Sequence, residues 1–263
     1  MNGWRKASAG IAFGIWALAA AACSKGGESG GAAGGGSAAA AAPVAFPVDT
    51  TTAATVTGRI AFTGAKPAPQ RIDMSEEATC AAKHPNGAFT EAVVVNDNGT
   101  LRNVFIYVKS GLPANLTFPT PAAVEINQDG CQYIPHVFGV QVGQTISIRN
   151  SDSLLHNIKA VPTTNRPFNI SQPTNMTTER AFSSAEVMVP FQCNVHGWMN
   201  AFVGVLPHPY FSVSGADGTF RIGRLPPGTY VIEAWHERLG TQTATVTVGA
   251  SESKDVAFTF RGS

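Results

Sequence analysis

From residue 53 onward, apolar and polar positions alternate with a period of two. The first such run has an apolar or small residue at every second position (Val56, Gly58, Ile60 and Phe62). Residues 104–108 (VFIYV) form another β-prone run, and the Asn-Asp-Asn-Gly sequence at 96–99 predicts a hairpin before it. After the first 22 residues, the sequence contains no run with helical periodicity beyond a single turn at 79–84. The pattern therefore predicts an all-β protein.

The first 22 residues have a different pattern, which is typical of a targeting segment. Two basic residues precede the twelve-residue apolar run Ile11–Ala22, which is too short to span a membrane as a mature helix. Cys23 follows a run of alanines and resembles the first residue of a processed bacterial lipoprotein, with Ala20 at the position where leucine is commonest. We therefore expect residues 1–22 to be a signal peptide and Cys23 to carry lipid. Cleavage after an Ala-x-Ala site, without lipid, is the alternative.

The next segment, residues 24–43, consists almost wholly of glycine, alanine and serine. It has too few large apolar side chains to form a core, so we expect residues 23–50 to be a flexible linker behind the lipidated cysteine. Either processing route places the mature protein outside the cytoplasm, in the bacterial periplasm or cell envelope, where conditions are oxidising. The net charge of +1 and the 13% of charged residues argue against a nucleic-acid partner.

A group of soft metal-binding side chains lies between two β-prone runs near residue 195. Cys193, His196 and Met199 have the spacing Cys-x2-His-x2-Met, so a thiol, an imidazole and a thioether share one short loop. A second imidazole, His156, follows the run ISIRNSDSLL at 146–155. Two imidazoles and one thiolate with a weak axial methionine are the ligands of a blue-copper site. The sequence therefore predicts one such copper, held by these four residues.

These motifs resemble the cupredoxin family, and the short ligand loop is most similar to that of amicyanin. The resemblance covers about residues 117–207 and implies a Greek-key β-sandwich with one type 1 copper. It implies that Asn157 is not a ligand itself but forms a hydrogen bond that links the two ligand-bearing loops. It also implies that the ring edge of His196 reaches an apolar surface, where Val195 and Trp198 would contact a partner. Gly197 departs from the proline of amicyanin, which leaves this loop freer.

Three other interpretations of the same residues fit the sequence less well. A buried cysteine is more often a small hydrophobic residue than a ligand, and a lone methionine fills a core. Structural zinc sites use thiolates and imidazoles but not methionine. A Cys–His nucleophile pair would need a third orienting group, which the sequence does not show. We therefore do not expect an enzyme.

The sequence after residue 207 has a second resemblance. The turns DGTF at 217–220 and LPPGTY at 225–230 resemble the carboxypeptidase regulatory-like, transthyretin-like β-sandwich. In that family the first strands resemble VTGRIAFTG and NVFIYV, which here precede the copper domain. We therefore expect a discontinuous second sandwich, residues 51–116 with 208–263, with the cupredoxin domain inserted at 117–207. Two consecutive domains are the alternative. The family resemblance leaves carbohydrate or protein binding open for this module.

Two cysteines and one histidine remain to be placed. In an oxidising compartment we expect Cys80 and Cys131 to form a disulfide, with two free buried thiols as the alternative. His136 follows the aromatic-x-Pro sequence at 133–135, which in cupredoxins lies toward the metal end, so it is expected near the site but not as a ligand.

Taken together, the motifs predict a membrane-tethered electron carrier that cycles between copper(II) and copper(I). Its redox partner would be a protein such as a cytochrome or a membrane oxidoreductase. The alternative is a protein that stores, senses or delivers copper without redox turnover, with the second sandwich as its docking module. The absence of a methionine cluster favours the carrier.

Overall fold

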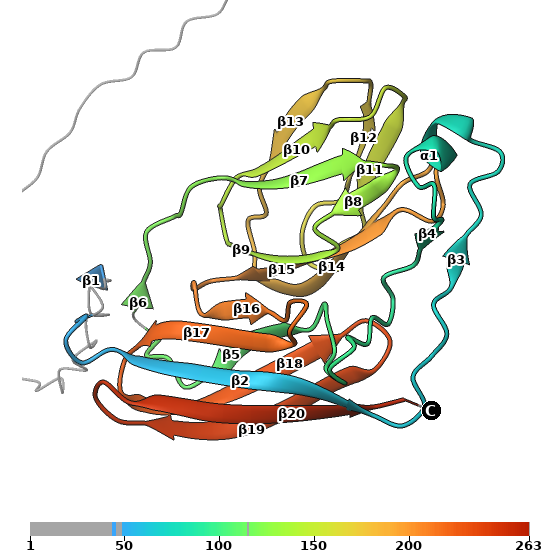
Figure 1. Ribbon diagram of the computed structural model, residues 1–263. Coiled ribbons are helices and arrows are strands. Elements are labelled where there is room, and N and C mark those ends of the chain that lie inside the picture. The colour runs from blue at the N-terminus through green and yellow to red at the C-terminus, as the bar shows by residue number, and fades with distance from the viewer. Residues whose placement is uncertain (1–43, 46–48, 115, 263) are drawn as a thin grey trace, which may run out of the picture. The chain divides into compact units, whose positions relative to one another are not determined.

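The computed structural model describes residues 44–45, 49–114 and 116–262 (Figure 1). The predicted signal peptide, the lipidated Cys23 and most of the linker lie outside the described residues. Within them the regular secondary structure is almost entirely β-strand, as predicted, with one short helix, α1 (Ala78–Ala82). In this part of the chain no helix has the length and apolar character needed to cross a membrane.

Two sheets formed by residues 124–206 make up the central sheet pair. Hydrogen bonding joins the strands in the order β13 (Thr177–Arg180), β10 (Ile146–Asn150), β7 (Val124–Asp129) and β8 (Gln132–Ile134) in one sheet. The other sheet has the order β12 (Phe168–Gln172), β11 (His156–Ala160), β14 (Glu186–Gln192), β15 (Asn200–Leu206) and β9 (Val137–Gln141). The pairs β7–β10 and β9–β15 are parallel, and the other neighbours are antiparallel.

The period-two pattern explains how the central sheets pack. Alternate residues of β10 are buried, as are alternate residues of β14 from Val189 onward. The buried side chains of both sheets form one hydrophobic cluster (Ile126, Ile146, Ile148, Ile158, Val189, Phe191 and Val203 among them). Burying one such branched or aromatic side chain contributes roughly 1.5–3 kcal/mol.

Strands from the two ends of the described chain make up the outer sheet pair. One sheet has the order β17 (Thr219–Leu225), β2 (Ala54–Thr63) and β20 (Ser253–Arg261), and β2 runs parallel to β20. The other has the order β16 (Phe211–Val213), β5 (Phe105–Ser110), β18 (Gly228–His236) and β19 (Gly240–Val248). In both sheets, strands that precede residue 117 pair with strands that follow residue 207 (Figure 1). The exact domain boundaries stay a prediction.

Two glycines allow the central and outer sheet pairs to approach each other closely. A Cβ atom on Gly204 would lie 2.4 Å from the Phe105 ring, and one on Gly139 would lie 2.4 Å from the Phe211 ring. The aromatic rings of β5 and β16 therefore pack directly on the backbone of β9 and β15. A small cluster of buried residues fills the same contact (Phe105, Tyr107, Val137 and Leu206).

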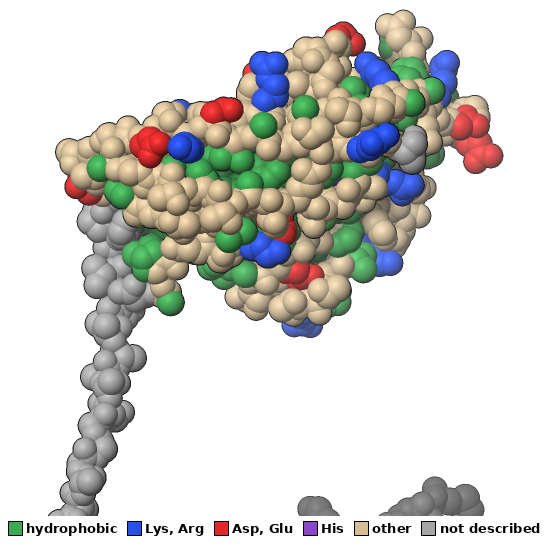
Figure 2. Space-filling model, turned by 90° about the horizontal axis from the view of Figure 1, so that it is seen from below, with side chains coloured by type: hydrophobic (Ala, Val, Ile, Leu, Met, Phe, Trp, Pro, Cys, Tyr) green, Lys and Arg blue, Asp and Glu red, His purple; other side chains and the backbone are tan. Residues whose placement is uncertain are grey.

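The face of the molecule on the side of the outer sheet pair has charged side chains of both signs (Figure 2). Basic and acidic side chains are interspersed among apolar and neutral ones (Figure 2). This distribution matches the small net charge of the whole chain.

Residues 71–89 leave the outer sheet pair and lie on the central one, and we call them the cover segment. They contain β3 (Arg71–Ile72), the helix α1 and β4 (Ala88–Phe89), and β3 pairs with β4. The segment adds four buried side chains to the central core (Ile72, Met74, Cys80 and Ala88). The predicted disulfide between Cys80 and Cys131 is confirmed, and it joins α1 to the turn between β7 and β8.

One short pair of strands lies outside these sheets and the cover segment. It consists of β1 (Val44–Ala45) and β6 (Leu116–Thr117), which run parallel.

Candidate metal centre

The four predicted ligands come from the ends of three neighbouring strands. His156 is the first residue of β11, Cys193 directly follows β14, and Met199 directly precedes β15. Because β11, β14 and β15 are neighbours in one sheet, the loop 193–199 lies beside the start of β11. All four side chains are buried.

Three of the four predicted ligands come together. Ligand atoms of His156, Cys193 and His196 all lie within 4.8 Å of one another. The Nδ1 atoms of the two histidines face each other at 2.9 Å. The loop is held by its own backbone, because the Met199 N–H donates to the His196 carbonyl at 2.9 Å and the Cys193 N–H donates to the Met199 carbonyl at 3.2 Å.

The surroundings of Cys193 favour its thiolate. Burial raises the pKa of this thiol. Hydrogen bonds from the His156 ring, when both of its nitrogens are protonated, and from the backbone N–H groups of His196, Val195 and Asn157 outweigh this effect, and the net pKa is lowered. The N–H of His196 lies 3.3 Å from Sγ. A thiolate is the form of cysteine that binds metals.

The donor set fits a soft or borderline metal. Two imidazole Nδ1 atoms and one thiolate, all buried, are ligands that copper and zinc accept. A bound copper would be held by His156, Cys193 and His196, with Met199 at the end of the same loop, and would supply one-electron redox chemistry.

Asn157 connects the two ligand-bearing segments. Its Oδ1 atom accepts the N–H of Asn194 at 3.1 Å, and its Nδ2 atom donates to Oδ1 of Asn169 at 2.6 Å. The Asn157 carbonyl accepts the hydroxyl of Tyr133. Its role beside a metal stays a prediction, but the hydrogen bond places the start of the ligand loop relative to β11.

One residue of the site was not predicted from the sequence: Asp152, a buried carboxylate directly behind His156. Its Oδ2 atom lies 2.8 Å from Nε2 of His156, on the side of the ring away from His196. The signal that could have found it is the spacing of four residues between His156 and Asp152, which belongs to the run at 146–155 directly before this histidine. Tyr133 was also missed, although the aromatic-x-Pro sequence had been singled out.

The expectation that the ring edge of His196 reaches the surface is wrong. The residue is only 3% exposed, because the cover segment lies over it. Nε2 of His196 is 3.9 Å from Sγ of Cys80, and its ring centroid is 5.1 Å from that of Trp198. Trp198 is half-buried and donates its indole N–H to the carbonyl of Cys131 at 3.0 Å. Val195 is 50% exposed, so only one of the two predicted docking residues lies freely on the surface.

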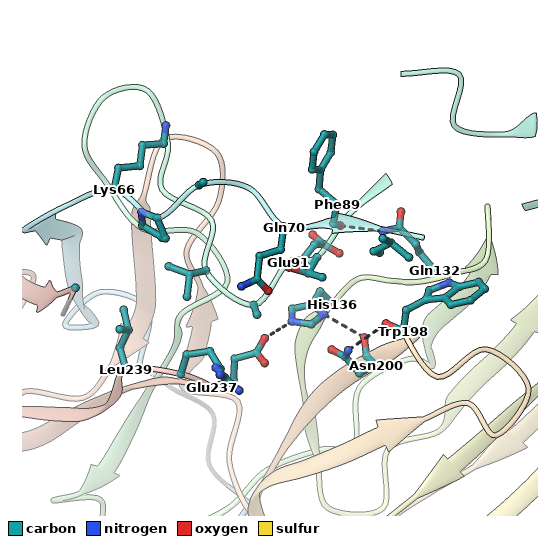
Figure 3. A pocket seen from close by; sticks show the side chains of 18 of the residues that line it. Lys66, Gln70, Phe89, Glu91, Gln132, His136, Trp198, Asn200, Glu237 and Leu239 are labelled. Atoms are coloured by element: carbon teal, nitrogen blue, oxygen red, sulfur yellow. Dashed lines mark hydrogen bonds and ion pairs between the residues drawn. The ribbon is translucent and has the colours of Figure 1, made fainter. Parts of the chain in front are cut away.

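A cleft of about 630 Å³ borders the site and contains His136 (Figure 3). His136 Nδ1 donates to the carbonyl of Asn200 at 3.1 Å, and Nε2 lies 2.5 Å from a carboxylate oxygen of Glu237. Burial lowers the pKa of His136, but the hydrogen bond with Glu237 outweighs it and the net pKa is raised. Both ring nitrogens of His136 are thus engaged by protein partners. Trp198 and Met199 also line the cleft.

Comparisons with known proteins gave matches among solved structures. No protein-family model matches the chain. No curated protein matches it. A copper-containing nitrite reductase from Thermus scotoductus SA-01 is 17% identical with a TM-score of 0.31, and the match covers 38% of this chain and 26% of that one.

Two small copper-protein structures match over nearly their whole length. A purple cupredoxin from Nitrosopumilus maritimus is 24% identical, with a TM-score of 0.28, over 32% of this chain and 99% of that one. An oxidised amicyanin variant is 19% identical, with a TM-score of 0.30, over 38% of this chain and 97% of that one. Similarities with these TM-scores assign no function to this chain.

Proposed function

We propose that the protein is an electron carrier with one type 1 copper held by His156, Cys193, His196 and Met199. The observation that carries this proposal is the buried group of two imidazoles and one thiol, whose ligand atoms lie within 4.8 Å of one another. Burial of all three leaves a metal few water ligands, and the closed hydrogen-bonded loop limits how far the ligands can move. Ligands that move little between copper(II) and copper(I) suit electron transfer, because little rearrangement accompanies each step.

The chain's own residues would hold the metal in complementary ways. His156 is fixed by the sheet, because it begins β11 and bonds Asp152. The other three belong to the loop between β14 and β15, which is tied to β11 through the hydrogen bond between Asn157 and Asn194. A Cys–His nucleophile pair would need a third group that orients the histidine, and Asp152 holds His156 in that way. Cys193 is only 5% exposed, however, so a substrate would have poor access to its sulfur, and we propose a carrier and not an enzyme.

The proposal extends to location and partners. The signal-like and lipoprotein-like segment would place the protein at the membrane, outside the cytoplasm, with the linker leaving the folded part free to move. Its redox partner would be a protein such as a cytochrome or a membrane oxidoreductase. The outer sheet pair would serve as an additional binding module, with carbohydrate as one class of ligand.

Titration with copper(II) tests the function. We expect one equivalent to bind and an intense absorption to appear at the red end of the visible spectrum, because a short copper–thiolate bond gives charge transfer. Titration with zinc(II) is the matched control and should give no colour. The colour should bleach with a one-electron reductant and return on oxidation. Colourless copper binding, or binding without reversible reduction, would instead favour storage or delivery of copper.

A further inference from the structure

We propose that Lys83 and Asp152 together position His156 and set the electrostatic field at the metal centre. Asp152 belongs to the central sheet pair, whereas Lys83 belongs to the cover segment. The cover segment, which lies between β2 and β5 in the sequence, would thus influence the orientation of His156 and the reduction potential of the copper. This inference rests on the proposed copper function.

Asp152 has a full set of hydrogen-bond partners although its side chain is wholly buried. Oδ2 accepts from His156 Nε2 and from the N–H of Cys131, both at 2.8 Å. Oδ1 accepts from Lys83 Nζ at 2.6 Å and from the N–H of Gly130 at 2.9 Å. A buried carboxylate is costly unless it is paired and hydrogen-bonded. These four donors compensate the cost and keep Asp152 ionised.

The bond to Asp152 determines which nitrogen of His156 faces the ligand group. A carboxylate only accepts hydrogen bonds, so the proton of the neutral ring lies on Nε2. Nδ1 then has a free lone pair, and it is this atom that faces Nδ1 of His196 at 2.9 Å. A carboxylate behind a ligating histidine fixes its tautomer and orientation. Asp152 is therefore a positioning residue for His156.

Lys83 completes the arrangement from the other side. Its ammonium group bridges Asp129 and Asp152, with 2.6 Å to each carboxylate, and its side chain is 39% exposed. The position of Lys83 is fixed by two other bonds of the cover segment, the Cys80–Cys131 disulfide and the contact of His84 Nε2 with the Gly130 carbonyl at 2.7 Å.

The two charges affect copper in opposite directions. A nearby negative charge stabilises copper(II) more than copper(I), and a nearby positive charge does the reverse. Neutralising Asp152 should therefore raise the reduction potential, and neutralising Lys83 should lower it. If the two residues had only structural roles, their substitutions would not shift the reduction potential in opposite directions.

The first experiment uses the metal-free full-length protein and nitrogen NMR of the histidine rings. At a pH where the His156 ring is neutral, we expect a single tautomer with the proton on Nε2. Its proton should show the downfield shift of a strong hydrogen bond. A neutral ring with its proton on Nδ1 would overturn the positioning role. This measurement does not depend on copper, so it decides the role of Asp152 even if the wild-type protein binds no copper.

The second experiment compares potentials and copper affinities of four variants. Asp152→Asn should weaken copper(II) binding about 10- to 100-fold and raise the potential, and Asp152→Glu should restore most of the wild-type value. Lys83→Met should lower the potential. A tenfold change in the copper(II)-to-copper(I) affinity ratio corresponds to about 59 mV. The control is Lys66→Met, because Lys66 pairs with exposed Asp97 at 3.6 Å, and it should leave the potential unchanged.

The signs of the shifts decide the outcome. Opposite shifts for Asp152→Asn and Lys83→Met support the proposal. Shifts of the same sign, or a Lys83→Met shift no larger than that of Lys66→Met, would overturn it. If Asp152→Asn does not fold, the comparison of Lys83→Met with Lys66→Met still decides, because both lysines are partly exposed.

Discussion

The Sγ atom of Cys80 lies 3.9 Å from Nε2 of His196, although the two residues are 116 positions apart. The disulfide with Cys131 holds Cys80 at this place, so the cover segment closes the site on the side where an exposed ring edge had been expected. Access to His196 thus depends on how firmly this segment is attached.

Removing the disulfide should destabilise the fold and open the site. For a sequence separation of 51, the loss of chain restriction in the unfolded state costs about 4 kcal/mol. We expect the double variant Cys80→Ala, Cys131→Ala to unfold at lower urea concentration and its His196 ring to exchange hydrogen with solvent faster. His208, which is buried in the outer sheet pair, is the internal control for exchange. Equal His196 exchange in variant and wild type would show that the other contacts alone hold the cover closed.

Two substitutions in the ligand loop should show which of its side chains is exposed and which contributes to the core. Val195→Glu should change the free energy of unfolding by no more than about 0.5 kcal/mol, because Val195 is 50% exposed. Trp198→Glu should cost at least about 2 kcal/mol, because it removes an indole that packs on His196 and donates to Cys131, and introduces a charge there.

The same two variants also test docking. Electron exchange of the Val195→Glu protein with a protein partner should be slower by several-fold if this face is used, since one charge in a small apolar interface weakens it strongly. Stopped-flow kinetics would measure the rate. An unchanged rate would move the docking site elsewhere, and the cleft that Trp198 lines is the next candidate.

Two substitutions among the predicted ligands should have distinct effects on the copper protein. Cys193→Ser should abolish the visible absorption, because the thiolate is its source. Met199→Leu should keep the colour and raise the potential, and should cost less than about 1.5 kcal/mol of stability because the exchange conserves volume in a buried position. Spectra and redox titrations measure both. A colourless Met199→Leu protein would contradict an axial role for Met199.

Stability should fall in mild acid because of His236. This residue is buried, and its Nδ1 atom accepts the N–H groups of Arg238 and Leu239 at 3.2 and 3.3 Å. Burial lowers the pKa of His236 from 6.5 to about 4. Because the folded pKa lies below the unfolded one, the neutral ring stabilises the fold above pH 6.5, and this contribution is lost as the pH falls to 4.

The size of the stability loss expected from His236 follows from its pKa shift. A shift of this size corresponds to about 3 kcal/mol. His236→Asn keeps a hydrogen-bond acceptor but does not titrate, so its melting temperature should fall less between pH 6.5 and 4. Parallel curves for variant and wild type would show that other groups cause the acid sensitivity.

The sequence by itself determined the strand content and the identity of the candidate metal ligands. Period-two alternation depends only on which residues face a core, so runs such as 54–63 and 146–150 appear in the structure as β2 and β10. Cys193, His196 and Met199 are close in the chain, so their grouping on one loop needed no tertiary information. The disulfide was also predictable, because two remaining cysteines are expected to pair in the oxidising compartment that the leader sequence predicts.

Only the tertiary structure decided what surrounds these side chains. Lys83, Asp152 and His156 meet because the cover segment crosses from the outer to the central sheet pair, and a contact across 69 residues leaves no periodic signal in the sequence. The burial of His196 has the same origin, since its exposure depends on a segment whose own sequence carries no metal-binding motif. Local patterns report local structure, whereas burial, charge pairing and ligand orientation are set by which distant segments pack together.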